Sequence, residues 1–236
     1  MKGEKMKFVI VLFILAALSF AGEITQFGGT AGTSTWTGND AETVYWSQPP
    51  TSDAMASQNF LDEPTYDAGV ADDVEFADAT TINKIRWWGG YWNGVNPTPI
   101  DSPIEIYLYL DDGTGNAPTL PQHTSAIDSW MVAVGEYTEV ADGANFVCEY
   151  IFPSWVVFDA GVKYWIEVRK AMPYAGNGQY GWIQSEPIQL SSCVQGFDGL
   201  GTVWWTAQNI DVAFELVFDD ALALERTSWA GIKANF

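Results

Sequence analysis

The sequence predicts an all-β protein, a single-domain antiparallel two-sheet β-sandwich of the jelly-roll or galactose-binding-like kind. From Val44 to Asp219, apolar and polar side chains alternate with a period of two, and Gly, Asp and Asn punctuate the alternating stretches. Beyond the N-terminal apolar run, no stretch long enough for a helix shows helical periodicity. Hydrophobic residues make up 47% of the chain and include 12 Trp, which is enough for a sizeable core without help from metals.

Residues 1–21 have the pattern of a secretory signal peptide. A basic head, Lys2–Lys7, precedes the thirteen-residue apolar run Phe8–Phe20, and Ser19 and Ala21 supply the small side chains that a signal peptidase needs. A membrane-spanning helix needs about 20 apolar residues, so an uncleaved anchor is the weaker alternative. We therefore expect a secreted or cell-surface protein with no membrane span after the signal is removed.

Three further parts follow the signal peptide. Residues 22–43 are rich in Gly, Thr and Ser and predict a leader or an edge segment rather than a helix. Residues 44–219 carry the sandwich, and residues 220–236 form a C-terminal tail.

Five stretches give clear strand predictions: Asn83–Trp92, Pro103–Leu110, Phe146–Phe152, Lys163–Lys170 and Ile210–Phe218. Weaker strand patterns occur at Ala71–Phe76, Gln179–Gln184 and Thr202–Thr206. After Leu110, Asp111–Asn116 predicts a tight turn, because Asp, Gly and Asn tolerate the backbone angles of a reversal.

Each strand is expected to bury one face and to expose the other to water. In Pro103–Leu110 the inward side chains are Ile104, Ile106, Leu108 and Leu110, and the outward ones are Glu105, Tyr107 and Tyr109. In Lys163–Lys170 the inward side chains are Tyr164, Ile166 and Val168, and the outward ones are Trp165, Glu167 and Arg169. Along Ile210–Phe218 the inward face is Ile210, Val212, Phe214, Leu216 and Phe218.

The charge of the chain restricts its partners. The sequence holds 30 acidic against 10 basic side chains, a formal net charge of -20. Such a field repels nucleic acid phosphates and anionic lipid head groups, so neither is expected as a partner. The acidity favours solubility, and some of the carboxylates are candidates for binding Ca²⁺, which prefers oxygen ligands.

Cys148 and Cys193 are the only two cysteines. In an oxidising compartment an even pair usually forms a disulfide, so we expect one between them.

Several motifs along the sandwich region resemble an uncharacterised domain family of secreted bacterial proteins. The motifs are Trp46–Pro50, Ser57–Phe60, Ala71–Val74, Ile85–Trp92, Ile106–Gly113, Lys163–Ile166 and Asp211–Leu216. Val74 stands where members of that family usually carry Phe. The resemblance implies a β-sandwich at the cell surface or in the medium, and it implies no reaction.

The C-terminal segment resembles sorting-like endings of exported bacterial proteins with the pattern Ser-Trp-Gly-x-Ile-Lys. It reads Ser228-Trp229-Ala230-Gly231-Ile232-Lys233, and Ala230 before Gly231 departs from the pattern. The alternative is an amphipathic frayed terminus.

Catalytic motifs are scarce. His123, the single histidine, lies in a loop-like stretch and is expected to be a solvated loop residue. A Ser-His-Asp site would need it, zinc sites normally use more His or Cys, and no G-x-S-x-G motif occurs. Paired carboxylates could support glycoside hydrolysis, but an acidic chain provides such pairs by chance.

The aromatic side chains of Asn83–Trp92 suggest a second kind of site. Alternation places Ile85, Trp87 and Tyr91 on one face and Arg86, Trp88 and Trp92 on the other, beside the bare backbone of Gly89 and Gly90. Indole rings stack on the C–H faces of sugars. The candidate glycan platform is Trp88, Trp92, Arg86, Asn93 and Trp165. The competing interpretation is core packing or subunit contact, which large aromatic residues dominate.

Asp72, Asp73 and Asp211 are the candidate calcium ligands, because each opens a predicted strand at an end of the sandwich. Alternatively, they accept hydrogen bonds from turn amides or pair with Arg86 or Arg169.

These observations rank three functions. The first is a non-catalytic structural or interaction protein outside the cell, with a protein partner or with itself through self-assembly. The second is a carbohydrate-binding module for an extracellular glycan, and the third is a glycoside hydrolase.

Overall fold

The computed structural model describes residues 42–94, 101–197 and 204–222. The predicted signal peptide, most of the leader, the start of the weak strand Thr202–Thr206 and the sorting-like segment Ser228–Lys233 lie outside these residues.

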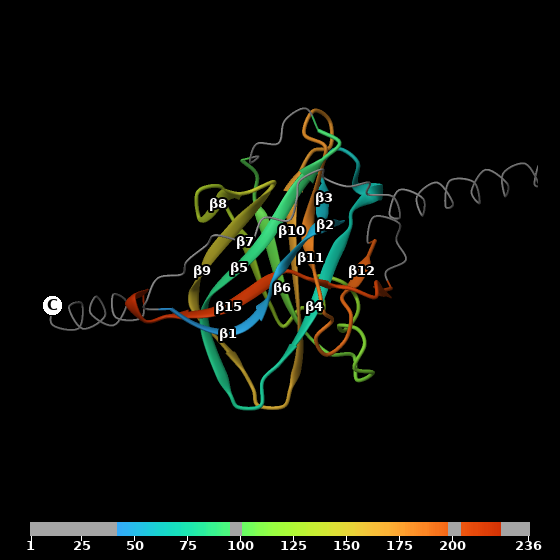
Figure 1. Cartoon of the computed structure of the whole chain (residues 1–236). Helices are drawn as coiled ribbons and strands as arrows, with labels where there is room; N and C mark the ends of the chain where they lie inside the picture. Colours follow the sequence, from blue (N-terminus) through green and yellow to red (C-terminus); the bar gives the residue numbers. More distant parts are fainter. Residues whose placement is uncertain (1–41, 95–100, 198–203, 223–236) are drawn as a thin grey trace, which may run out of the picture.

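Two sheets packed face to face make up the described structure, as the sequence predicts (Figure 1). The first sheet has eight strands: β1 (Glu42–Gln48), β2 (Pro50–Ala56), β5 (Thr80–Trp92), β8 (Tyr137–Asp142), β9 (Asn145–Phe158), β11 (Gln179–Ser185), β14 (Asp211–Val212) and β15 (Phe214–Asp219). Long β5 lies at its centre, because it pairs with β15, β11 and β9.

The second sheet has seven strands: β3 (Gln58–Phe60), β4 (Gly69–Glu75), β6 (Ile104–Leu110), β7 (Asp128–Val132), β10 (Lys163–Met172), β12 (Val194–Gly196) and β13 (Thr206–Ala207). A 3₁₀ turn, η1 (Pro64–Tyr66), lies between β3 and β4. The ladders are antiparallel except for the short parallel pairing of β3 with β10. The architecture is therefore an antiparallel β-sandwich.

The core between the sheets contains most of the predicted inward side chains, but the prediction is wrong for Leu110, which is 38% exposed at the end of β6, and Phe218 is only partly buried. Ile85, Trp87 and Tyr91 of β5 pack there against Ile106 of β6 and Val168 of β10. The predicted strand Ile210–Phe218 is split at Ala213 into β14 and β15, but Val212, Phe214 and Leu216 still face the core. Alternation thus identified the buried face of each long strand.

Contrary to expectation, the outward face of β6 and β10 in the second sheet is not exposed to solvent. Tyr109, Trp165 and Glu167 have no exposed surface. The connection between β6 and β7 covers them: the backbone N–H of His123 donates to the Tyr109 hydroxyl, and Trp165 donates to Asp111. A long connection folded back over the sheet turns its outward face into a second buried layer.

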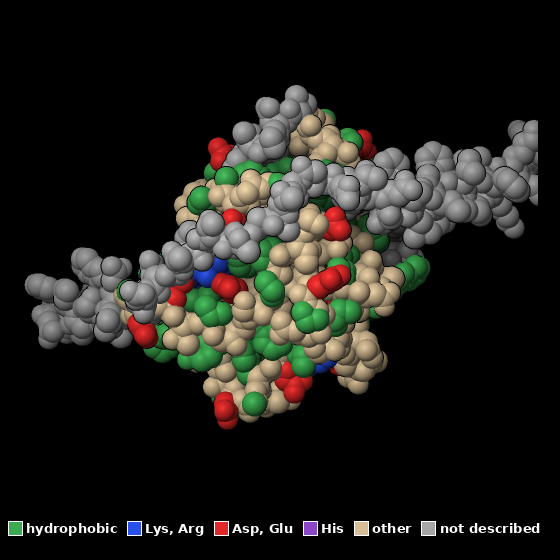
Figure 2. Space-filling model, viewed as in Figure 1, with side chains coloured by type: hydrophobic (Ala, Val, Ile, Leu, Met, Phe, Trp, Pro, Cys, Tyr) green, Lys and Arg blue, Asp and Glu red, His purple; other side chains and the backbone are tan. Residues whose placement is uncertain are grey.

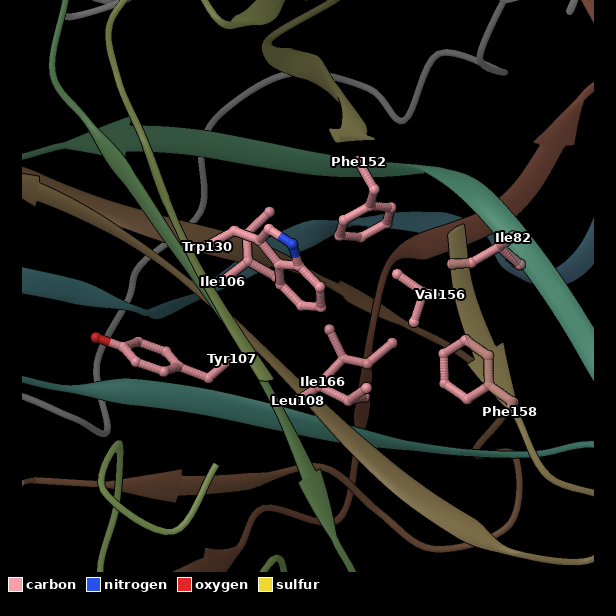
Figure 3. A pocket seen from close by; sticks show the side chains of 9 residues that line it. All are labelled: Ile82, Ile106, Tyr107, Leu108, Trp130, Phe152, Val156, Phe158 and Ile166. Carbon is pink, nitrogen blue, oxygen red and sulfur yellow. The ribbon is translucent and has the colours of Figure 1, made fainter. Parts of the chain in front are cut away.

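The interior is close to filled. Figure 3 shows a void between the sheets lined by apolar side chains, among them Ile82, Trp130 and Phe158, and its volume is about 10 Å³. A space of that size holds about one water molecule, and an apolar lining offers that water few partners. Within the described ranges, no helix is both long and apolar enough to cross a membrane.

Candidate functional site

Trp88 is buried, although it lies on the outward face of the first sheet. Its indole is 3% exposed and packs against Val147, Ile183 and Ala213. Its Nε1–H donates to Asp142 Oδ2 at 3.1 Å. This ring has its partners within the chain and presents no stacking face to a sugar.

Trp92 lies at the end of β5 with its ring against Gly181. A Cβ built on Gly181 would come 2.4 Å from the Trp92 ring, so that glycine provides the space in which the indole lies. Asn93 follows with φ 58° and donates to Gln179 Oε1 at 2.9 Å. On the inward side, Gly89 accommodates the ring of Tyr180 in the same way. The rings that lie on these bare backbones are therefore the protein's own.

Arg86 is 2% exposed and is held by three carboxylates of neighbouring strands. Its Nη2 lies 2.8 Å from Glu42 and 2.7 Å from Glu149, and its Nη1 pairs with Glu215. Although burial opposes ionisation of Glu42, hydrogen bonds from Lys84 and Arg86 hold its pKa below the usual value. The guanidinium of Arg86 therefore binds carboxylates of the chain itself and does not face a ligand.

Trp165 belongs to the opposite surface of the sandwich. It lies on β10 of the second sheet, is fully buried, and donates Nε1–H to Asp111 Oδ2 at 3.1 Å. Trp88 and Trp165 therefore cannot line one surface. The predicted glycan platform is not assembled: Trp88, Arg86 and Trp165 are buried, and only Trp92 and Asn93 keep exposed surface.

Asp72 and Asp211 are both fully buried, and their charges interact. Asp72 faces inward beside its cross-strand partner Ile166 and accepts hydrogen bonds from the backbone N–H groups of Asp73 and Val212. Asp211 accepts from Gln48 at 2.9 Å. Burial, reinforced by the charge of Asp211, raises the pKa of Asp72 well above its usual range, and burial likewise raises the pKa of Asp211 to about 6.

Asp73 points the other way, so the predicted calcium set does not converge. It faces outward beside Trp165, and its Oδ2 accepts from Lys163 at 2.7 Å and from the N–H of Ser191 at 3.1 Å. Among the described residues, no group of three His, Cys, Asp or Glu side chains could hold a metal ion. These aspartates bind backbone amides, as the alternative anticipated, and Arg86 and Arg169 pair with glutamates instead.

The expected disulfide is not formed. Cys148 and Cys193 are both buried free thiols. Cys148 lies in β9 opposite Trp87, whereas Cys193 precedes β12 and lies 3.5 Å from the sulfur of Met55. Burial raises the pKa of both thiols well above the usual value.

The expectation that His123 is a solvated loop residue is wrong. Its side chain is 17% exposed, and Nε2 lies 3.1 Å from Oε1 of Glu167, which has no exposed surface. The same carboxylate accepts from the Tyr109 hydroxyl at 2.6 Å and from Gln122 Nε2 at 3.1 Å. The imidazole also stacks on Tyr107 with ring centroids 4.4 Å apart. These contacts hold the loop onto the second sheet.

Sequence reasoning missed this cluster because its members are far apart in the chain. Alternation does place Tyr109 and Glu167 on outward faces, but it gives neither the pairing of β6 with β10 nor the return of the loop. A further requirement appears only in three dimensions: a Cβ on Gly69 would come 1.9 Å from Glu167 Oε1. Glycine at that position leaves room for the buried carboxylate.

Comparison with known proteins gives one result at the level of a family. No curated protein and no solved structure matches the chain. A family model described as a domain of unknown function, DUF7901, matches residues 44–217, which span both sheets. The resemblance to an uncharacterised family is thereby confirmed, and the chain belongs to the DUF7901 family.

Proposed function

We propose that this chain is a non-catalytic structural or interaction protein that acts outside the cell through protein–protein contacts. The observation that carries the proposal is an outward apolar patch on the first sheet, formed by Val44, Ile151, Trp155 and Val157. These side chains are 45%, 43%, 50% and 57% exposed. Single exposed apolar residues are common, but a contiguous patch usually marks an interaction surface.

Strand register brings the patch together. Val44, Val217, Lys84 and Ile151 form one cross-strand row through β1, β15, β5 and β9. Trp155 extends it along β9, and its ring contacts Phe218 of β15 at 6.0 Å between centroids. Figure 2 shows hydrophobic side chains gathered over the lower part of this face.

A polar rim borders the patch. Lys84 lies within the row itself, 5% exposed and paired with Glu42, whereas Arg86 with Glu149 and Glu215 forms the adjoining row of the same face. An apolar centre with charged groups at its margin is the usual anatomy of a protein–protein interface. The patch therefore suits a partner protein, and another copy of this chain is the partner that we propose.

Export rests on the signal-peptide pattern of residues 1–21 and is part of the proposal. N-terminal sequencing of protein recovered from the medium or the cell surface should begin at Gly22. Deletion of residues 221–236 tests the sorting-like tail: secretion without surface retention supports sorting, and unchanged retention rejects it.

Assembly can be measured by light scattering on the processed protein. We expect concentration-dependent oligomers that are lost in Trp155→Ser. Trp88→Phe is the matched control, because that indole is buried. A monomer at all concentrations would contradict self-assembly.

Glycan binding remains the second candidate, carried now by a different residue. Trp204 is 63% exposed and lies just before β13, so its ring is open to stacking. A glycan array discriminates between the two functions. Saturable binding that is lost in Trp204→Ala supports a carbohydrate-binding module, whereas a silent array together with oligomers supports assembly.

A further inference from the structure

Lys170 of β10 is enclosed completely between the two sheets. Its side chain has no exposed surface. Its cross-strand partner Ile104 and its strand neighbours Val168 and Met172 all belong to the core, so its side chain crosses the interior toward the first sheet. Lysine almost always keeps its ammonium group in water, and this position therefore calls for a specific explanation.

Aromatic rings surround the lysine nitrogen. The ring centroids of Tyr91, Tyr137 and Tyr180 lie 5.1, 5.5 and 5.5 Å from Nζ. These tyrosines come from β5, β8 and β11, three strands of the first sheet. They keep bulk water away from the amine while their π faces tolerate a cation.

Glu139 of β8 is the acidic partner inside this enclosure. It faces inward because it pairs with the core residue Cys148, and its side chain is 7% exposed. Lys170 Nζ lies 2.6 Å from Glu139 Oε2. The Tyr91 hydroxyl joins the two groups, since it accepts a hydrogen bond from Nζ and donates one to Glu139 Oε1 at 2.5 Å.

The enclosure keeps both groups of this pair away from bulk water. Two buried charges lose hydration that their mutual attraction repays only in part. Transfer of one proton from the ammonium to the carboxylate gives a neutral amine in contact with a carboxylic acid. Fixing two reactants in contact can raise their effective concentration to about 10⁵–10⁸ M, and the pair is then arranged for condensation.

We propose that Lys170 and Glu139 condense to an intramolecular isopeptide bond that joins β10 to β8. After the proton transfer, the Nζ lone pair attacks Cδ of Glu139 and forms the C–N bond. Tyr91 takes a proton from the nitrogen and gives its own to the carboxyl oxygen that it contacts. The proton on the other carboxyl oxygen passes to this oxygen as its C–O bond breaks, so one water molecule leaves, the amide carbonyl remains, and the step needs no oxidant, reductant or co-reactant.

The bond would cross-link the two sheets covalently through the core. β8 pairs with β9 alone among the described strands, so it lies at the edge of the first sheet, where fraying is easiest. Because Cys148 and Cys193 are free thiols, the chain gains no cross-link from them. An amide bond would provide one that reducing agents cannot break. The inference concerns the interior and does not depend on the assembly surface.

Intact mass spectrometry of the processed, denatured protein tests the proposal. We expect a mass lower than that of the sequence by one water molecule, and a proteolytic digest in which the Lys170 peptide is joined to the Glu139 peptide. A full-length mass with both peptides free overturns it. Water loss located at an Asp-Gly pair such as Asp142-Gly143, where a cyclic imide can form, also counts against it.

Three variants sharpen the result. Lys170→Met should restore the full mass. Lys163→Met is the matched control and should keep the loss, because Lys163 makes an ion pair of similar length, 2.7 Å, but on the outward face at 17% exposure. Tyr91→Phe keeps the ring and removes the relay, so an unreacted fraction is expected, and complete reaction would exclude the role given to Tyr91.

Discussion

Nε2 of His123 lies 3.1 Å from Oε1 of Glu167, and that carboxylate has no exposed surface. The contact joins a loop residue to the outward face of β10, 44 positions further along the chain. It explains how an outward strand face becomes buried: polar side chains of the loop provide hydrogen bonds to the carboxylate that water would otherwise provide.

We expect Glu167→Gln to lower the free energy of unfolding by about 1–3 kcal/mol, the usual cost of leaving a buried donor unsatisfied. Gln122 Nε2 donates to Oε1 of Glu167, and the Tyr109 hydroxyl donates to Oε2. If the oxygen of the new amide keeps the bond from Tyr109, its N–H₂ group takes the place of Oε1 and faces the N–H₂ group of Gln122, so two donors meet. Urea unfolding measures the change. Glu136→Gln is the control, because Glu136 is exposed, and equal effects of the two substitutions would contradict the prediction.

Arg86→Met should destabilise the fold by about 3–5 kcal/mol, because it leaves Glu215 without its cation and leaves Lys84 alone to pair with Glu42 and Glu149. Arg86→Lys keeps the charge but cannot reach three carboxylates with one ammonium, so an intermediate loss is expected. Thermal or urea unfolding provides the measurement. An Arg86→Met protein as stable as the wild type would show that the network contributes nothing.

The stability of the fold should decrease as pH rises from about 4 to about 6 through the contribution of Asp211. Its pKa is raised from 3.8 to about 6 in the folded protein, so the folded state binds more protons than the unfolded state across that window. The stabilising contribution is complete below the unfolded pKa and is lost as pH passes the folded one. Asp72 acts in the same direction.

Asp211→Asn isolates this contribution. Oδ1 of Asp211 is buried without a hydrogen-bond partner, so an amide can keep the contacts of Oδ2 with its oxygen, at the cost of a buried N–H₂ group in the place of Oδ1. The fall in unfolding free energy between pH 4 and 6 should be smaller than in the wild type, because an asparagine does not titrate. Parallel pH profiles would exclude the assignment.

Excess Ca²⁺ and EDTA should give the same melting temperature. Asp73 is turned outward to Lys163 while Asp72 faces the core, and among the described residues these carboxylates do not form a group of three that could hold one ion. Differential scanning calorimetry of the processed protein makes the comparison. A higher melting temperature in Ca²⁺ would require a site other than this triad.

Both cysteines should resist alkylation in the folded protein and react once it is unfolded, without any reductant. Burial keeps the thiols protonated by raising their pKa, and the protonated form is a poor nucleophile. Mass spectrometry after iodoacetamide treatment should detect two added groups under denaturing conditions and none under native conditions. No added group in denatured, unreduced protein would indicate the disulfide that the sequence suggested.

The sequence by itself determined the fold class and the inward faces. Ile106, Val168 and Leu216 could be assigned to the core, because alternation with a period of two is a local property that any antiparallel pairing must respect. The same reasoning placed Trp88 and Trp165 correctly on outward faces.

Only the tertiary structure decided what those outward faces meet. Whether Trp165 is solvated or covered depends on where residues 111–127 return, and whether Lys170 lies beside Glu139 depends on how one sheet is set over the other. Both are long-range relationships between strand pairing and loop path. A periodic pattern has no information about them, because it describes each strand alone.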